Sequence, residues 1–183
     1  MAKQQISQLD LIRTFLDNNH IDSSKVLYEK EKYHDGVSFE MKRKIICHKD
    51  IDYVLYRFDP NRIKLFPYFT EVSGLHKICD YLLFAEHGHH LYLLLIELKK
   101  GTDSANKQLI ASHCFADFII ASAKRIGITL TENIVIYKIR VSEERAKKRN
   151  RSTKIKQLVP DQNGIINYDH SEVFRIKEII EID

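Results

Sequence analysis

Hydrophobic positions along the chain follow two different spacings. Residues 7–18 carry apolar side chains three or four positions apart, which predicts an amphipathic helix. Residues 37–70 instead alternate apolar and charged side chains, and three short runs within them predict antiparallel strands: 37–40, 51–56 and 63–65. The N-terminal part of the chain is therefore predicted to be a helix followed by an antiparallel β region.

The longest apolar runs lie in the centre of the chain. Residues 77–85 form an apolar strand that a single acid, Asp80, interrupts, and a loop built around Gly88 leads into the next strand. That second strand, residues 91–98, is apolar almost throughout, as is typical of a strand buried on both faces. The two runs are predicted to form a central β-hairpin.

A helix and a further strand follow the hairpin. Asp103 is the candidate N-cap of the helix, and Lys124, Arg125 and Gly127 are typical of its C-terminus. Residues 134–139 form the next apolar strand. Strand, crossover helix and strand together predict a βαβ unit whose two strands are parallel.

The C-terminal segment carries two apolar stretches. Residues 165–168 predict a short strand, whereas the periodicity of residues 173–182 fits a strand or a helix. We therefore predict an α/β fold with a central mixed β-sheet, a crossover helix and an extra N-terminal antiparallel β region. We assign it to one domain in three parts: residues 1–70, a core at 71–140, and a basic loop with the C-terminal segment at 141–183.

Composition narrows the class of protein. The 183 residues are 44% hydrophobic and 30% charged, which is typical of a globular domain. Three separated cysteines form no CxxC pair and the N-terminus has no apolar signal segment, so we expect a cytoplasmic protein without disulfides. No apolar run is long enough to span a membrane, and a net charge of +4 is compatible with a nucleic-acid partner. The sequence is compatible with a homodimer and does not define the oligomeric state.

Three charged residues occupy positions where buried strands rarely carry charge. Asp80 interrupts the first strand of the hairpin, and Glu97 and Lys99 end the second. Glu97 and Lys99 are two positions apart and share one face, while strand pairing can bring Asp80 alongside Glu97. Because carboxylate oxygens are the ligands that Mg²⁺ and Mn²⁺ prefer, the pattern indicates a candidate metal site beside a lysine. An ion pair at the end of a sheet is the alternative.

Asp80, sixteen intervening residues and then Glu97-Leu98-Lys99 on the second strand of a hairpin resemble the PD-(D/E)xK nuclease superfamily. The runs KICDYLLF and LIELKKG are also similar to an uncharacterised bacterial branch of it. The resemblance implies a restriction-endonuclease-like core and a metal-dependent nuclease. It implies that Asp80 and Glu97 hold Mg²⁺ or Mn²⁺, with the Leu98 carbonyl as a further ligand. It also implies that Lys99 positions the attacking water.

The resemblance covers about residues 75–140 and leaves one acid unassigned. Gln108 matches a glutamine that the family often presents from the following helix, and Cys79 replaces the family's proline. The family usually adds an upstream glutamate from its first helix, and this chain offers several upstream acids: Asp10, Asp17, Glu29, Glu31, Glu40 and Glu71. Glu71 is preferred because it lies just ahead of the hairpin.

A second E-x-K tripeptide, Glu40-Met41-Lys42, provides an internal comparison. No acid-bearing apolar strand precedes it in a hairpin, and no helix follows it. Its strand alternates polar and apolar residues, as is typical of a half-exposed strand. We therefore predict an exposed strand here and no second site.

Ser112 and a group of histidines are further candidates with two interpretations each. Ser112 lies one turn after Gln108, where it can contact substrate or allow close packing of the helix on the sheet. His87, His89 and His90 lie in the hairpin loop, where we expect solvated side chains because no other ligand is spaced to complete a metal site.

Basic residues after the helix are candidates for phosphate binding. Arg140 ends the following strand, and residues 145–156 are rich in lysine and arginine, including Arg149, Arg151 and Lys154. The predicted function is hydrolysis of phosphodiester bonds in DNA or RNA by a Mg²⁺- or Mn²⁺-dependent nuclease. The alternative is a catalytically inactive nucleic-acid-binding or assembly module of the same fold.

Overall fold

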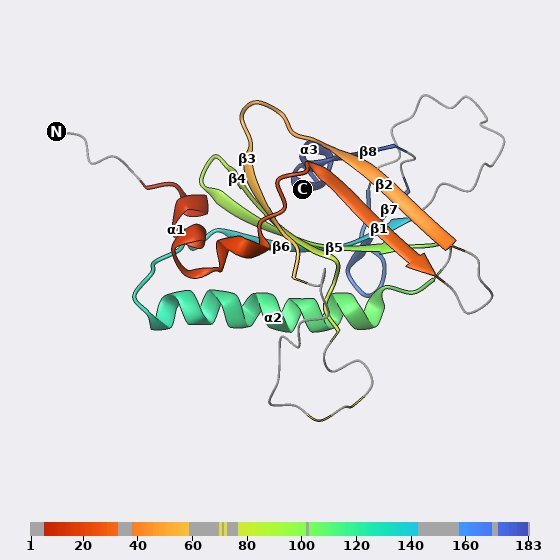
Figure 1. Ribbon diagram of the computed structural model, residues 1–183. Helices are drawn as coiled ribbons and strands as arrows, with labels where there is room; N and C mark the ends of the chain where they lie inside the picture. The colour runs from red at the N-terminus through yellow and green to blue at the C-terminus, as the bar shows by residue number, and fades with distance from the viewer. Residues whose placement is uncertain are drawn as a thin grey trace.

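The computed structural model describes residues 6–32, 38–58, 70, 72, 77–101, 103–142, 158–169 and 172–182. Figure 1 shows the arrangement of its helices and strands. Their bounds, in chain order, are α1 (Gln8–Phe15), a 3₁₀ turn (Asn18–His20), β1 (Val26–Lys32), β2 (Ser38–Ile46), β3 (Asp52–Tyr56), β4 (Tyr81–His87), β5 (His90–Lys99), α2 (Asn106–Arg125), β6 (Ile134–Ser142), β7 (Ile165–Tyr168), β8 (Val173–Arg175) and α3 (Ile176–Ile180).

Five strands form the central sheet, in the order β3-β4-β5-β6-β7. The first three are antiparallel neighbours, while β5, β6 and β7 run parallel. Helix α2 connects β5 to β6, as required for two parallel neighbours. The predictions of an α/β fold, a mixed sheet and a parallel βαβ unit are confirmed.

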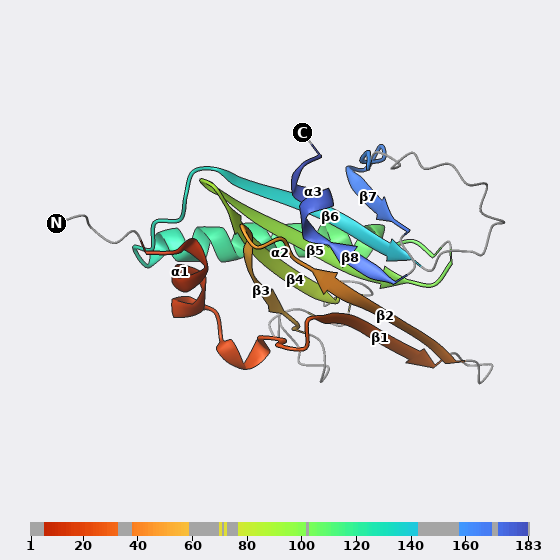
Figure 2. The same cartoon turned by 90° about the horizontal axis from the view of Figure 1, so that it is seen from above.

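The two faces of the central sheet are covered by different elements. Helices α1 and α2 pack on one face, and a three-stranded sheet of order β1-β2-β8, followed by α3, packs on the other (Figure 1). Figure 2 shows β2 between β1 and β8. The strands predicted at 37–40 and 51–56 do not form one antiparallel region: the first falls in β2, which pairs with β1 and β8, and the second is β3, at the edge of the central sheet.

Strand β5 shows why the centre of the sequence is so apolar. Its odd-numbered residues, such as Leu93, are buried with α1 and α2, and its even-numbered residues, such as Leu94, are buried with the small sheet. A strand covered on both faces needs apolar side chains at every position, because an unpaired polar group there would be desolvated. Glu97 continues the odd-numbered row on the α2 face.

Several boundaries differ from the prediction. Asp80 forms a bend before β4, and it does not interrupt a strand. Helix α2 begins at Asn106 after Ala105, which makes no side-chain cap, so the assignment of Asp103 as N-cap is wrong. Strand β1 was not predicted, because its sequence VLYEKEK is too charged to stand out as a strand. The predicted strand at residues 63–65 lies outside the described residues.

The C-terminal stretch that fitted a strand or a helix contains both, since β8 leads directly into α3. The hairpin loop turns at Gly88, whose positive φ of 59° is the conformation that glycine adopts without strain. In the described part of the chain, no helix has the length and apolar character needed to cross a membrane.

Candidate active site

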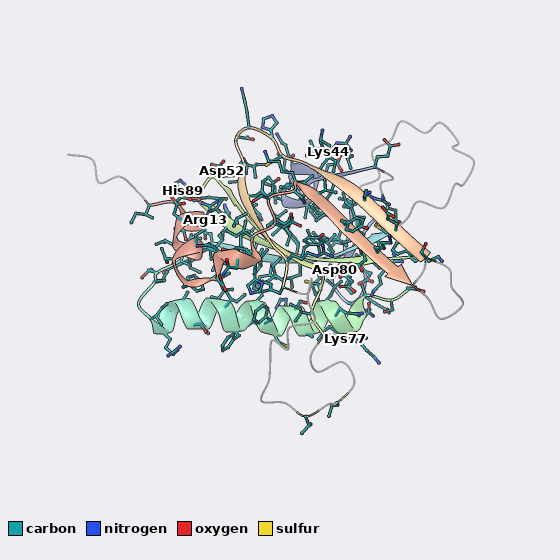
Figure 3. All side chains as sticks on the ribbon, in the orientation of Figure 1. Arg13, Lys44, Asp52, Lys77, Asp80 and His89 are labelled. Carbon is teal, nitrogen blue, oxygen red and sulfur yellow. The ribbon has the colours of Figure 1, made fainter. Side chains whose placement is uncertain are left out.

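Asp80, Glu97 and Lys99 meet at one end of the central hairpin. The Asp80 backbone N–H donates to Glu97 Oε2 at 3.1 Å, and the Leu98 N–H donates to Asp80 Oδ2 at 2.7 Å. Lys99 Nζ lies 2.6 Å from Glu97 Oε1. The structure therefore places the three residues in one cluster, at the opposite end of the sheet from His89 (Figure 3).

The register of the hairpin produces this arrangement. Tyr81 pairs with Ile96, so the next position outward sets Asp80 opposite Glu97. Beyond Tyr81 and Ile96, side chains take over the hydrogen bonding between the two segments. The Glu97 carboxylate accepts from the Asp80 N–H, and the Asp80 carboxylate accepts from the Leu98 N–H. A residue of an antiparallel strand directs its N–H and C=O to the same side. Because the Leu98 N–H points at Asp80, the Leu98 carbonyl lies on the Asp80 side of β5.

Ser112 of α2 anchors the main chain next to Asp80. Its side chain is fully buried, and its Oγ accepts from the Cys79 N–H at 2.6 Å while donating to the Gln108 carbonyl at 2.7 Å. The hydroxyl therefore ties α2 to the residue before Asp80. These contacts favour the interpretation of Ser112 as a packing and positioning residue.

Burial raises the pKa of both carboxyl groups, and repulsion by Glu97 adds to the shift at Asp80. Loss of solvent and the negative charge of Glu97 raise the pKa of Asp80 well above its ordinary value. Loss of solvent also raises the pKa of Glu97, although the charge and hydrogen bond of Lys99 oppose that shift. Glu97 is only 3% exposed. The cluster therefore holds two carboxyl groups whose raised pKa values are only partly offset by Lys99.

Replacing Asp80 with asparagine should stabilise the protein in the absence of metal. The folded-state pKa of Asp80 lies above its unfolded value, so its ionisation lowers the free energy of unfolding as pH rises above that unfolded value. Asp80→Asn removes this effect and should raise the free energy of unfolding by on the order of 1 kcal/mol at neutral pH. Urea denaturation in EDTA measures the difference. A gain that does not shrink at acidic pH would contradict the electrostatic explanation.

Glu29 of β1 is a third acid at this site. Its negative charge contributes to the raised pKa of both Asp80 and Glu97. The position of β1 is fixed by the Tyr81 hydroxyl, which accepts from the Tyr28 N–H and donates to the Tyr28 carbonyl, both at 2.9 Å. The small sheet therefore brings Glu29 to the end of the central sheet that carries Asp80 and Glu97.

The sequence did not identify the upstream acid. Glu29 was one of several acids considered, and Glu71 was preferred because it precedes the hairpin. Glu71 lies outside the described residues, whereas Glu29 reaches the site from a different sheet. The sequence carried no signal that singled out Glu29, because the stretch VLYEKEK is too charged to stand out as a strand.

Gln108 and Arg140, two further predicted site residues, make structural contacts in the folded chain. Gln108 lies in the first turn of α2, partly buried, where its carbonyl accepts from Ser112. Arg140 pairs with Glu97 in the β5–β6 register, so it lies at the expected end of the sheet. Its guanidinium, however, donates to the carbonyls of Asp103 (2.8 Å) and Gly101 and to Asn167 Oδ1 (3.3 Å). These bonds favour a role in holding the loop after Lys99.

The second E-x-K tripeptide is an exposed strand, as predicted. Glu40 and Lys42 are 44% and 66% exposed and form an ion pair at 2.9 Å on the open face of β2, with Met41 buried beneath. At the hairpin loop, His89 and His90 are exposed. The predicted nucleic-acid contacts Arg149, Arg151 and Lys154 lie outside the described residues.

The sequence predicts core thiols at Cys79, which faces away from Asp80 on its strand, and at Cys114. Cys79 is fully buried, and burial raises the pKa of its thiol, so it remains protonated. Cys114 is exposed on α2, so that prediction is wrong: it lies on the solvent side of the helix. The Cys79 thiol is therefore not activated for nucleophilic chemistry.

The donor set fits a hard divalent cation. Asp80 and Glu97 supply carboxylate oxygens, the chemistry that Mg²⁺ and Mn²⁺ select, and a cation would relieve their mutual repulsion. In the described ranges, no three side chains of His, Cys, Asp and Glu are arranged to hold a metal ion as they stand. A bound ion would therefore need the main chain, water or a substrate phosphate to complete its coordination, as is usual for Mg²⁺.

Comparison of the chain with protein-family models, curated proteins and solved structures found no match.

Proposed function

We propose that the protein is a metal-dependent nuclease with a restriction-endonuclease-like core. The observation that carries this proposal is the joining of Asp80, Glu97 and Lys99 by direct contacts at one end of a β-hairpin, with a third acid, Glu29, close enough to influence both carboxyl groups. A cluster of acids with a raised pKa is unfavourable for stability, which supports a functional reason for its presence.

Each residue has a distinct role in this proposal. Asp80 and Glu97 hold Mg²⁺ or Mn²⁺, and the Leu98 carbonyl is placed to contribute as well. The ion stabilises negative charge on the phosphodiester undergoing attack. Lys99, held 2.6 Å from Glu97 and 20% exposed, orients the attacking water and stabilises the developing charge on phosphate. Its ammonium lies beside Glu97, and in this proposal it acts by position and charge.

Cleavage of labelled single- and double-stranded DNA and RNA with Mg²⁺ or Mn²⁺ tests the proposal. We expect one substrate class to be cleaved, EDTA to stop the reaction and Glu97→Ala to abolish it. Glu40→Ala is the matched control, because it removes the acid of the exposed E-x-K tripeptide. Equal cleavage by Glu97→Ala and the parent protein would place the activity elsewhere or in a contaminant.

A catalytically inactive nucleic-acid-binding module is the second candidate. The absence of a ready three-ligand group among the described residues favours it. The same substrate panel separates the two functions, because the module would bind one of these nucleic acids and cleave none of them with either metal.

A further inference from the structure

Arg57 lies beside Glu29 and Tyr81, at a position that the strand register fixes. Tyr56 pairs with Leu82, so the next position sets Arg57 opposite Tyr81, the neighbour of Asp80. The Arg57 backbone N–H donates to the His20 carbonyl at 2.8 Å, which anchors the main chain. The guanidinium lies 5.2 Å from the centre of the Tyr81 ring, and this cation–π contact restricts its direction.

The donors of Arg57 are used differently from those of the neighbouring arginines. Arg140 donates to two backbone carbonyls and a side-chain oxygen, and Arg43 donates to the carbonyls of Lys42 and Ser142. In the part of the chain that the structure describes, the side chain of Arg57 makes one polar contact, an ion pair with Glu29 at 3.6 Å. That separation exceeds a hydrogen bond. The Arg57 side chain is also 26% exposed.

We propose that Arg57 binds a non-bridging oxygen of the phosphodiester substrate, an inference that rests on the proposed function. A guanidinium presents a planar fork of donors that matches phosphate, and stacking on Tyr81 holds that fork in place. Glu29 competes for the same cation in the substrate-free protein. Arg57 and Glu29 therefore have opposite effects on the binding of a polyanion.

The test measures binding without catalysis. Fluorescence anisotropy in EDTA follows binding of fluorescein-labelled DNA duplex and RNA strand over a range of salt concentrations. We expect Arg57→Gln to weaken binding roughly 10- to 100-fold, the effect of losing a hydrogen bond to a charged group. The slope of log affinity against log salt should also fall by about one, because one fewer phosphate is contacted. Arg125→Gln, at the exposed end of α2, is the charge-matched control and should leave the slope unchanged.

Glu29→Gln supplies a prediction of the opposite sign. It removes the competing acid and should tighten binding in EDTA by more than Glu40→Gln, which neutralises an exposed acid in the same small sheet. If Arg57 and Glu29 had only structural roles, the two substitutions would not change nucleic-acid affinity in opposite directions. If thermal unfolding shows that Arg57→Gln does not fold, the inference is tested by the affinities of Glu29→Gln and Glu40→Gln alone.

The outcomes separate this inference from the function on which it rests. A parent protein that binds none of the probes contradicts the proposed function and this inference with it. A parent protein that binds, together with unchanged affinity and slope in Arg57→Gln, overturns the role of Arg57 alone. Glu29→Gln binding no tighter than Glu40→Gln likewise overturns it.

Discussion

Lys99→Ala is expected to lower the cleavage rate by on the order of 10²–10³ while leaving Mn²⁺ binding largely intact. Lys99 is not a metal ligand in our proposal, and its ammonium acts on the water and on the charge that develops on phosphate. Removing a positive charge 2.6 Å from Glu97 also leaves that carboxylate free to bind a cation more strongly. Single-turnover cleavage and calorimetric titration with Mn²⁺ measure the two effects separately.

Two comparison variants separate the role of Lys99 from a general loss of charge and from a loss of metal binding. Lys42→Ala removes the lysine of the exposed E-x-K tripeptide and should change neither quantity. Asp80→Ala should lose metal binding and cleavage together, because a hard cation needs the carboxylate oxygens. Loss of metal by Lys99→Ala as complete as that of Asp80→Ala, or cleavage at the parental rate, would show that the role assigned to Lys99 is wrong.

Glu29→Gln is expected to reduce metal-dependent cleavage on the order of 10²-fold, an effect comparable to losing one electrostatic stabiliser of the transition state. Glu29 is the acid that the small sheet brings to the charges of Asp80 and Glu97, and removing it lowers the negative potential that attracts a divalent ion. Its Mn²⁺ affinity should therefore also fall. Metal titration and initial rates at saturating Mn²⁺ distinguish weaker binding from slower chemistry.

Glu71→Gln provides the direct comparison, since Glu71 was the upstream acid preferred from the sequence. We expect it to retain the parental rate, and Glu40→Gln to do the same as a control on the outer face of β2. If Glu71→Gln is inactive and Glu29→Gln is active, the sequence-based preference was correct and the assignment of Glu29 to the site is wrong.

The core of the site was predictable because its geometry is local. A hairpin that turns at Gly88 determines which residues face each other, and extending the register of Tyr81 with Ile96 sets Asp80 opposite Glu97. The i and i+2 spacing then places Lys99 on the face of Glu97. These relations need only the position of the turn and the alternation of side chains in strands.

Glu29 and Arg57 were not predictable in the same way. Their positions depend on contacts between distant segments: the hydroxyl of Tyr81 reaches the main chain of Tyr28, which is 53 residues away. The composition of β1 gives no local sign that it docks beside the hairpin. Likewise, the sequence alone did not decide whether Ser112 contacts substrate or packs α2 on the sheet. The buried hydrogen bond from the Cys79 N–H favours packing.

The central claim is that the acids at the end of β4 and β5 hold a divalent metal ion. Anomalous diffraction from crystals soaked in Mn²⁺ tests it most directly, with Asp80→Ala crystals as the control. We predict an anomalous peak within coordination distance of the carboxylates of Asp80 and Glu97, absent from the variant. No peak there at saturating Mn²⁺, or a peak only at His87 or His89 in the hairpin loop, would contradict the account.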